Sequence, residues 1–148
     1  MTVKTFSRGA FLPHYKEFSE NKSITAIPLP KEVVIPLHQH TGAPCRAVVK
    51  PGDEVKAGQR IGEADAFVTA FIHASVDGKV KAVEPRPYFT GTNVESVVIE
   101  VDAKQGEPAW QERDVSKLGV DQIKDAIKNA GIVGMGGAAF PTHVKLSP

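Results

Sequence analysis

The segment VKPGDEVKAGQRIGE, residues 49–63, is the part of the sequence that decides the expected fold. Pro51-Gly52-Asp53 is typical of a tight turn, and Gly58 permits a second turn a few residues later. Val55 and Ile61 are apolar, and we expect both to point inward to a core. The segment therefore predicts short β-strands joined by tight turns.

Short, β-branched segments of the same kind follow one another through residues 32–101, separated by glycine, proline and aspartate. Many short strands at close spacing indicate an all-β barrel or sandwich. Residues 72–83, IHASVDGKVKAV, form a second strand-turn-strand unit comparable to the first. Two such units facing each other resemble the barrel-sandwich hybrid of lipoyl and biotinyl carrier domains, which implies a mainly β fold. The strands are expected at residues 32–37, 46–50, 54–58, 59–63, 66–74, 78–83 and 96–102.

A lipoyl or biotinyl carrier attaches its cofactor to a lysine at the tip of its central hairpin. The corresponding hairpin here lies within residues 58–78, which contain no lysine. Matching the string GEADAF to the carrier pattern places Ala66 at the lysine position, and counting from the preceding glycine and isoleucine places Val68 there. Neither side chain can be acylated. The barrel is therefore expected to have a structural or docking role, and a degenerate carrier is the weaker alternative.

Composition divides the chain into three regions. Residues 1–30 contain three prolines and little periodicity, and we expect an extended amino-terminal arm. Residues 31–103 are the expected barrel-sandwich hybrid domain. Residues 104–148 contain a polar connector, a helix and a glycine-rich loop. Trp110 in the connector is expected to pack on the barrel, with a ring that faces a partner as the alternative.

A helix is expected within GVDQIKDAIKNAG, residues 119–131. Val120, Ile123 and Ile127 recur at the spacing of one helical face. The glycines at the two ends of this segment are suited to begin and to end the helix. The helix leads directly into a cluster of glycines.

The glycine-rich segment GIVGMGGAAFPTHVKLSP, residues 131–148, carries the most chemical information. Gly134, Gly136 and Gly137 have no side chains, so their backbone N–H groups can approach an anion or a flat ring closely. Lys145 would add a positive charge for a phosphate. The segment has neither the Gly-Lys-Ser/Thr run of a Walker motif nor the preceding strand of a dinucleotide fingerprint. Two interpretations stay open: a cofactor loop, or a tight turn that packs small residues against a helix.

Taken together, these motifs resemble the RnfC family, the NADH-oxidising subunit of the Rnf electron-transport complex. The glycine-rich segment is also similar to a motif in the flavin subunit of respiratory complex I. The resemblance extends over nearly the whole chain, and its motifs are specific in combination. It rests on residues 15–18 (YKEF), 28–44 (PLPKEVVIPLHQHTGAP), 48–84 and 131–146.

This resemblance implies that the glycine-rich loop binds FMN, with Lys145 near the flavin phosphate. Met135, Ala139 and His143 depart from the complex I pattern, although methionine and histidine are usual in RnfC proteins. No catalytic residue and no metal ligand is expected in this chain. The implied cofactor-binding residues are Gly134, Gly136, Gly137, Ala138, Phe140, Thr142 and Lys145.

By the same resemblance, the full-length protein would transfer electrons between NADH and ferredoxin through FMN and two [4Fe–4S] clusters, coupled to ion translocation by the complex. The rest of the FMN and NADH pocket and the cluster cysteines would lie downstream. The 148 residues are thus expected to be an inactive fragment that binds FMN poorly. This fragment would include the start of an α/β flavin-binding domain. Its partners would be other subunits of a membrane-bound complex, on the cytoplasmic face of the bacterial inner membrane. The alternative is a non-catalytic docking module.

Charge and cysteine content exclude several other classes of function. Lys and Arg number 18 against 17 Asp and Glu, and no run of like charge exceeds two residues, so a nucleic-acid partner has no electrostatic support. Cys45 is the only cysteine, and one thiol cannot form an internal disulfide or hold a zinc ion or an iron–sulfur cluster alone. The sequence has no signal-peptide core and no apolar stretch of membrane-spanning length.

The histidines and the cysteine each allow a functional and an ordinary interpretation. On a strand, His38 and His40 would lie on one face, an arrangement that suits zinc, but no third ligand is evident, so a surface or hydrogen-bonding role is favoured. His73, beside apolar neighbours, is expected to be a hydrogen-bonded core or interface residue. Cys45 has either a thiol pKa lowered by Arg46 or, as the favoured interpretation, an inert and partly buried thiol.

Overall fold

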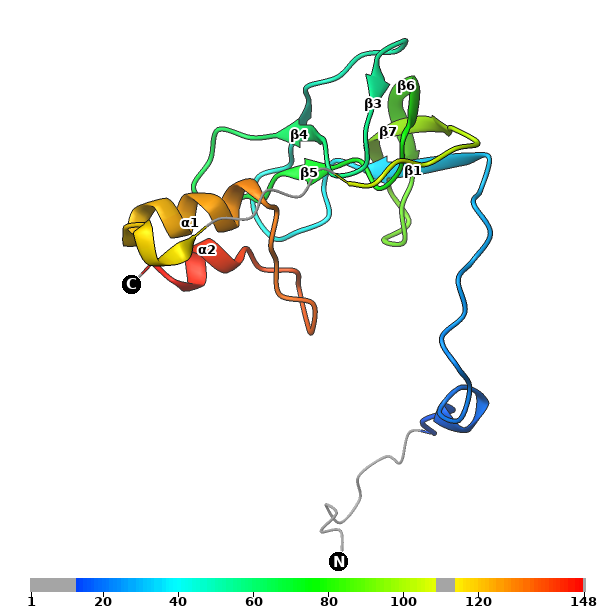
Figure 1. Cartoon of the computed structure of the whole chain (residues 1–148), viewed down its shortest axis with the longest axis horizontal. Helices are drawn as coiled ribbons and strands as arrows, with labels where there is room; N and C mark the ends of the chain where they lie inside the picture. The colour runs from blue at the N-terminus through cyan, green and yellow to red at the C-terminus, as the bar shows by residue number, and fades with distance from the viewer. Residues whose placement is uncertain (1–12, 109–113, 148) are drawn as a thin grey trace, which may run out of the picture.

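A computed structural model describes residues 13–108 and 114–147 of the chain. Its β-strands form one body, and two helices pack beside it (Figure 1). Residues 13–30 are exposed throughout and run away from the sheets, with one short 3-10 helix, η1 (Lys16–Phe18). Trp110 lies outside the described residues. The boundaries of the three regions stay predictions.

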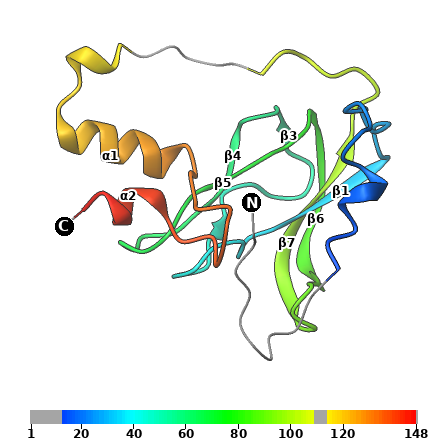
Figure 2. The ribbon, with the colours of Figure 1, turned by 90° about the horizontal axis from the view of Figure 1, so that it is seen from below.

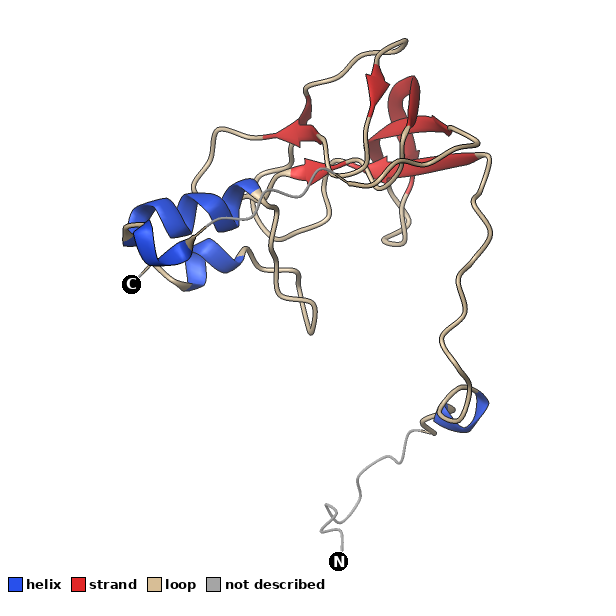
Figure 3. Ribbon diagram, in the orientation of Figure 1, coloured by secondary structure: helices blue, strands red, loops and turns tan. Residues whose placement is uncertain are grey.

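The strands form two antiparallel sheets, one of four strands in the order β1-β7-β6-β3 and one of three in the order β2-β4-β5 (Figure 3). This arrangement confirms the mainly β prediction. Only two α-helices, α1 (Val120–Asn129) and α2 (Thr142–Lys145), occur in the described part of the chain. The strands are β1 (Glu32–Pro36), β2 (Arg46–Ala47), β3 (Glu54–Val55), β4 (Arg60–Glu63), β5 (Ile72–His73), β6 (Gly78–Pro87) and β7 (Asn93–Val101).

One apolar core lies between the two sheets, and the turn-rich segment contributes to it as expected. Val55 is 1% exposed and Ile61 is fully buried. The turn that leads into β3 is closed by Asp53, whose carboxylate accepts a hydrogen bond from the Lys50 N–H (2.9 Å). The remaining buried members of the core are Ile35, Leu37, Cys45, Ile72, Ala74, Val76, Val80, Val97 and Ile99.

The strand expected over residues 66–74 is wrong for most of its length. Only β5 pairs with β4, and residues 64–71, which we call the β4–β5 loop, have no strand partner. The reason is that carbonyl groups of this loop accept hydrogen bonds from donors outside the sheets: Ala66 from Lys128, Phe67 from His143 and Val68 from the Ala43 N–H. β6 and β7, in contrast, are longer than expected and form the main hairpin of the larger sheet.

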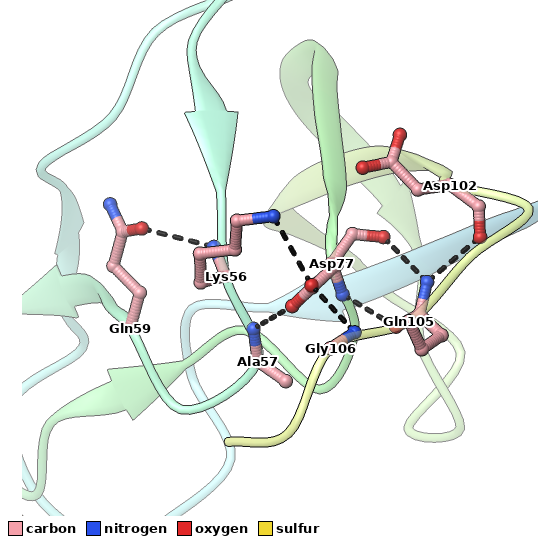
Figure 4. A network of polar contacts seen from close by, with 7 residues as sticks. All are labelled: Lys56, Ala57, Gln59, Asp77, Asp102, Gln105 and Gly106. Carbon is pink, nitrogen blue, oxygen red and sulfur yellow. Dashed lines mark hydrogen bonds and ion pairs between the residues drawn. The ribbon is translucent and has the colours of Figure 1, made fainter. Parts of the chain in front are cut away.

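The turn before β6 is fixed by a buried carboxylate, Asp77 (Figure 4). Its oxygens accept hydrogen bonds from the N–H groups of Ala57 (2.7 Å) and Gly106 (3.0 Å) and from the Lys56 ammonium (3.2 Å). The side-chain amide of Gln105 donates to the Asp77 carbonyl oxygen (2.9 Å). Asp77 therefore ties the segment after β3 and the segment that leaves β7 to one turn.

The predicted helix is confirmed as α1, and local chemistry explains both of its ends. The Gln122 side chain accepts a hydrogen bond from the Gly119 N–H at the start (2.9 Å). At the end, Gly131 has φ +68°, the left-handed conformation that favours glycine, and its N–H donates to the Lys128 carbonyl. That these elements begin an α/β flavin-binding domain stays a prediction.

Both views of the ribbon show α1 and α2 side by side near β4 and β5 (Figures 1 and 2). In Figure 1 the chain between the two helices forms a hairpin whose tip projects below the helices and below β5. No helix in residues 13–108 and 114–147 has the length and apolar character needed to span a bilayer.

Candidate cofactor-binding loop

The glycine-rich segment forms a hairpin-shaped turn between α1 and α2. Val133 and Pro141 form an antiparallel bridge at its base. Two further main-chain hydrogen bonds close the base, from the Gly134 N–H to the Phe140 carbonyl (3.0 Å) and from the Thr142 N–H to the Ile132 carbonyl (3.0 Å). We call residues 134–140 the glycine loop. Backbone hydrogen bonds therefore close the base of the loop.

The tip of the glycine loop is open. No other part of the described chain lies within 4 Å of the position that a side chain would take at Gly136 or Gly137. Neither glycine has a positive φ. Met135, which precedes them, is 94% exposed. Neither packing nor backbone conformation therefore requires glycine at 136 and 137, as the tight-turn interpretation would.

Lys145 lies at the base of the loop. Its ammonium is the atom nearest to the position that a side chain would take at Gly134, and it belongs to the flexible end of the lysine, which can move aside. Of the carboxylates that the structure describes, none forms an ion pair with Lys145. The structure thus places Gly134, Phe140, Thr142 and Lys145 together at the base. Gly136, Gly137 and Ala138 lie at the exposed tip, apart from the lysine.

The barrel contacts the glycine loop through Thr41, a residue that no sequence motif marks. The Thr41 hydroxyl donates a hydrogen bond to the Ala138 carbonyl (2.7 Å), and its N–H donates to the Ala139 carbonyl (3.4 Å). Ala139 has φ +50°, which is uncommon for a residue other than glycine. Because Thr41 lies 97 positions before Ala138, no local sequence signal points to this contact.

The helices contact the β4–β5 loop, the part of the barrel where a carrier would present its lysine. The Lys128 ammonium donates to the Ala66 carbonyl (2.9 Å) and lies 5.7 Å from the centre of the Phe71 ring. His143 donates through Nε2 to the Phe67 carbonyl (2.8 Å), and the two rings meet edge to face at 5.9 Å. This loop is therefore held, where a carrier tip would be free.

Two hollows border the glycine loop. The first, about 340 Å³, lies between the loop and β5, and includes His40, Phe71, His73, Met135 and Gly137 in its lining. The second, about 710 Å³, lies between the loop, the segment after β1 and the β6–β7 turn. Its lining includes His38, Thr41, Tyr88, Phe89, Gly137 and Ala138. The open tip thus faces space on both sides.

The histidine pair after β1 is not arranged as a metal site. His40 is buried: its Nε2 accepts the Ala70 N–H (3.1 Å), so Nδ1 carries the proton and donates to the Thr41 carbonyl (3.2 Å). His38 is exposed, and the two rings are nearly perpendicular. The pair follows β1 and is not part of a strand. No group of three or more metal-binding side chains occurs within the described ranges.

Cys45 and His73 show ordinary structural environments. Cys45 is buried and its thiol donates to the Ala70 carbonyl (3.3 Å); this burial raises the pKa of the thiol, opposite to the interpretation of a lowered pKa. Burial lowers the pKa of His73, an effect opposed by backbone hydrogen bonds with Asn129 and Phe71. His73 lies at the interface of β5 and the end of α1, as expected.

Comparison with known proteins identifies the family. Residues 4–104 match the family described as "RnfC Barrel sandwich hybrid domain". The chain is 46% identical over 151 residues to a subunit of the Na(+)-translocating ferredoxin:NAD(+) oxidoreductase complex of Acetobacterium woodii, covering 99% of this chain and 34% of that protein. It is 44% identical over 151 residues to a subunit of the proton-translocating ferredoxin:NAD(+) oxidoreductase complex of Clostridium ljungdahlii, covering 99% and 32%.

A more distant relative extends the same pattern. The chain is 38% identical over 154 residues to a subunit of the ion-translocating oxidoreductase complex of Pseudomonas aeruginosa, with 98% of this chain and 19% of that protein covered. The chain therefore spans about a third or less of the length of these curated relatives. The family match covers most of the amino-terminal arm and the barrel, and the alignments to the relatives extend beyond it. By its barrel and by its relatives, this chain belongs to the RnfC family.

Proposed function

We propose that this chain is the amino-terminal part of the RnfC-type subunit of an ion-translocating ferredoxin:NAD⁺ oxidoreductase. In this proposal the barrel-sandwich hybrid domain carries the start of an FMN-binding domain. The full-length subunit would pass electrons between NADH and ferredoxin through FMN and two [4Fe–4S] clusters. The names of the relatives support the reaction class, and the high coverage of this chain in each alignment supports its transfer.

The open tip of the glycine loop is the observation that carries the flavin part of this proposal. Gly136 and Gly137 leave bare backbone that no neighbour in the described chain uses, and Lys145 supplies an ammonium at the base with no carboxylate paired to it there. Bare backbone N–H groups at the tip can approach an anion or a flat ring closely, and the ammonium at the base can pair with a phosphate. FMN would supply the redox chemistry, and the chain would bind and orient it. The contacting residues would be Gly134, Gly136, Gly137, Ala138, Phe140, Thr142 and Lys145.

The other cofactors and the partners depend on sequence beyond residue 148. The only cysteine, Cys45, is buried in the barrel core, so the clusters would be held by downstream cysteines. NADH would likewise need the rest of the flavin domain. The full-length protein would bind the other members of the complex on the cytoplasmic face of the bacterial inner membrane, and would reach the membrane only through them.

Flavin content of the full-length subunit tests the proposal. We expect the purified wild-type subunit to show flavin absorbance, and Lys145→Ala to weaken FMN binding about tenfold or more, because a charge-assisted contact to phosphate is lost. Lys79→Ala is the matched control: Lys79 is exposed on β6 and belongs to no ion pair within the described residues, so FMN binding should not change. A full-length subunit that binds no flavin, or equal affinity in the two variants, contradicts the assignment.

The alternative, a docking module without redox chemistry, is supported by the β4–β5 loop. The two residues matched to the carrier-lysine position both lie in this loop: the Ala66 carbonyl accepts from Lys128, and the Val68 carbonyl accepts from the Ala43 N–H. The barrel is thus proposed to act as a scaffold and not as a carrier, whichever reaction the full-length protein performs. Intact-mass measurement should show no lipoyl or biotinyl increment. NADH-dependent dye reduction by the full-length protein separates the two functions, because the docking module would show none.

A further inference from the structure

We infer that the barrel holds the glycine loop in one conformation through two contacts, with Thr41 and His143 as positioning residues. The inference rests on the proposed function only for the identity of the ligand, FMN. The positioning itself is a statement about this chain and can be tested without a cofactor. In the first contact, Thr41 of the barrel binds the glycine loop itself. In the second, the β4–β5 loop of the barrel binds α1 and α2, the helices that flank the glycine loop.

The Thr41 contact decides which way the loop amides face. Thr41 donates to the carbonyl oxygens of Ala138 and Ala139. These carbonyls belong to the two peptide groups that flank the Cα of Ala139, the residue with positive φ. All described peptide bonds are trans, and in a trans peptide the C=O and the next N–H point in opposite directions. With both carbonyls turned toward Thr41, the N–H groups of Ala139 and Phe140 turn away from it. The barrel thus orients these two backbone donors of the loop.

Thr41 is itself fixed by its neighbours in the barrel. The buried His40 ring donates to the Thr41 carbonyl and accepts from Ala70, which binds the segment after β1 to the β4–β5 loop. Gly42, at φ +118°, lies so close to the Val68 carbonyl that a side chain there would collide with it. The next residue, Ala43, donates its N–H to the same Val68 carbonyl (2.9 Å). Thr41 therefore presents its hydroxyl from a rigid support.

The second contact fixes the helix that carries Lys145. His143, in α2, is 4% exposed, and its Nε2 donates to the Phe67 carbonyl. Its Nδ1 is buried and has no partner among the described atoms, so the bond to Phe67 is what fixes the orientation of this ring. Lys128 binds the adjacent Ala66 carbonyl from α1. Helices α1 and α2 therefore contact the loop in which a carrier would present its lysine.

Amide hydrogen exchange in the 148-residue chain tests the Thr41 contact directly. The reporters are the Gly134 and Thr142 amides, whose hydrogen bonds close the base of the loop. We expect Thr41→Val, which loses the hydroxyl donor, to speed exchange at both about five- to tenfold, the effect of losing one hydrogen bond. Thr41→Ser keeps the hydroxyl and should restore slow exchange. Amides of β7 should not change.

Thr25→Val is the matched control, because its hydroxyl makes an exposed contact with Ser23 in the arm, far from the loop in sequence. It should leave the Gly134 and Thr142 amides unchanged. Unaltered exchange in Thr41→Val, or equal acceleration in β7, would overturn the inference. His143→Leu should give the same local effect, and His143→Gln, which retains a donor near the Nε2 position, should partly reverse it.

FMN titration of the full-length subunit separates this inference from the proposed function. We expect Thr41→Val to raise the Kd for FMN about tenfold, the effect of one lost hydrogen bond on a loop that must be held in place, with Thr41→Ser and Thr25→Val near wild type. If wild type and Thr41→Val bind FMN equally, the positioning role is wrong and the proposed function stands. If no variant binds FMN while exchange at Gly134 still responds to Thr41, the proposed function is wrong and the positioning role stands.

Discussion

At the scale of the residue, Asp77 shows how one side chain organises distant segments. Hydrogen bonds from the backbone of Ala57 and Gly106, together with the Lys56 ammonium, hold the pKa of Asp77 below its ordinary value. A carboxylate with a lowered pKa in the folded state stabilises the fold above its unfolded pKa of about 4, and this contribution is lost as the pH falls through the folded pKa. Sequence alone marked Asp77 only as a turn residue, because its partners lie 20 and 29 positions away.

We expect Asp77→Asn to lower the urea midpoint of unfolding at pH 7, because an amide cannot accept from all three donors. The difference from wild type should narrow as the pH falls from the unfolded pKa of about 4 through the lower folded pKa of Asp77, where the folded wild-type carboxylate becomes protonated. Urea unfolding at a series of pH values measures both effects. Asp125→Asn, on the exposed face of α1, is the control and should leave the midpoint unchanged. A gap that stays constant as the pH is lowered would contradict the assigned role.

Alanine substitutions show which glycines the fold requires. Gly136→Ala and Gly137→Ala should change the free energy of unfolding of this chain by no more than about 0.5 kcal/mol, because neither site is packed. Gly131→Ala should cost about 1 kcal/mol or more, because φ is +68° and the new methyl group would meet the Phe71 carbonyl. Thermal unfolding of the three variants checks this. Equal losses in all three would restore the tight-turn interpretation.

At the scale of the element, the sequence predicted the helix and the turns that are stabilised by interactions between residues close together in the chain. Helix α1 lies within its predicted bounds because periodicity, Gln122 and Gly131 act within a few residues. The inward positions of Val55 and Ile61 follow from adjacent turns. The strand expected over residues 66–74 failed because its backbone binds distant donors, which no local pattern reports. For the same reason the glycine loop could be predicted, but its contact with the barrel could not.

The contact between α1 and the β4–β5 loop gives a prediction at this scale. Lys128→Met removes the donor to the Ala66 carbonyl and the cation beside the Phe71 ring, and should cost about 1 kcal/mol locally. Amides of α1 should then exchange roughly fivefold faster, while those of β7 keep wild-type rates. Lys124→Met, one turn earlier on α1, is the control. Exchange that rises to the same extent in β7 would show that the contact is not local.

At the scale of the whole molecule, the barrel and the helical segment form one support for a loop that faces open space. The barrel supplies Thr41 and the β4–β5 loop, and the helices supply Lys145 and the base of the glycine loop. Val120, Ile132 and Leu146 on the helical segment are 69%, 47% and 50% exposed.

The same geometry predicts how this chain alone handles FMN. Small-molecule sites bury most of the ligand surface, on the order of 70–90%. At the tip of the glycine loop, nothing lies within 4 Å of the side-chain positions of Gly136 and Gly137, so no wall encloses a ligand there. We therefore expect the 148-residue chain to bind FMN poorly or not at all, and the full-length subunit to bind it stoichiometrically.

Flavin fluorescence titration of the two proteins under identical conditions measures this difference. Purified 148-residue chain should be colourless, and added FMN should keep the fluorescence of the free flavin. Because the base of the loop is already closed by its own hydrogen bonds, weak binding would reflect missing walls and not an unfolded loop. Slow exchange at Gly134 and Thr142 in the same sample verifies that point. Tight, stoichiometric yellow flavin in the short chain would instead mean that the hollows beside the loop already form a complete site.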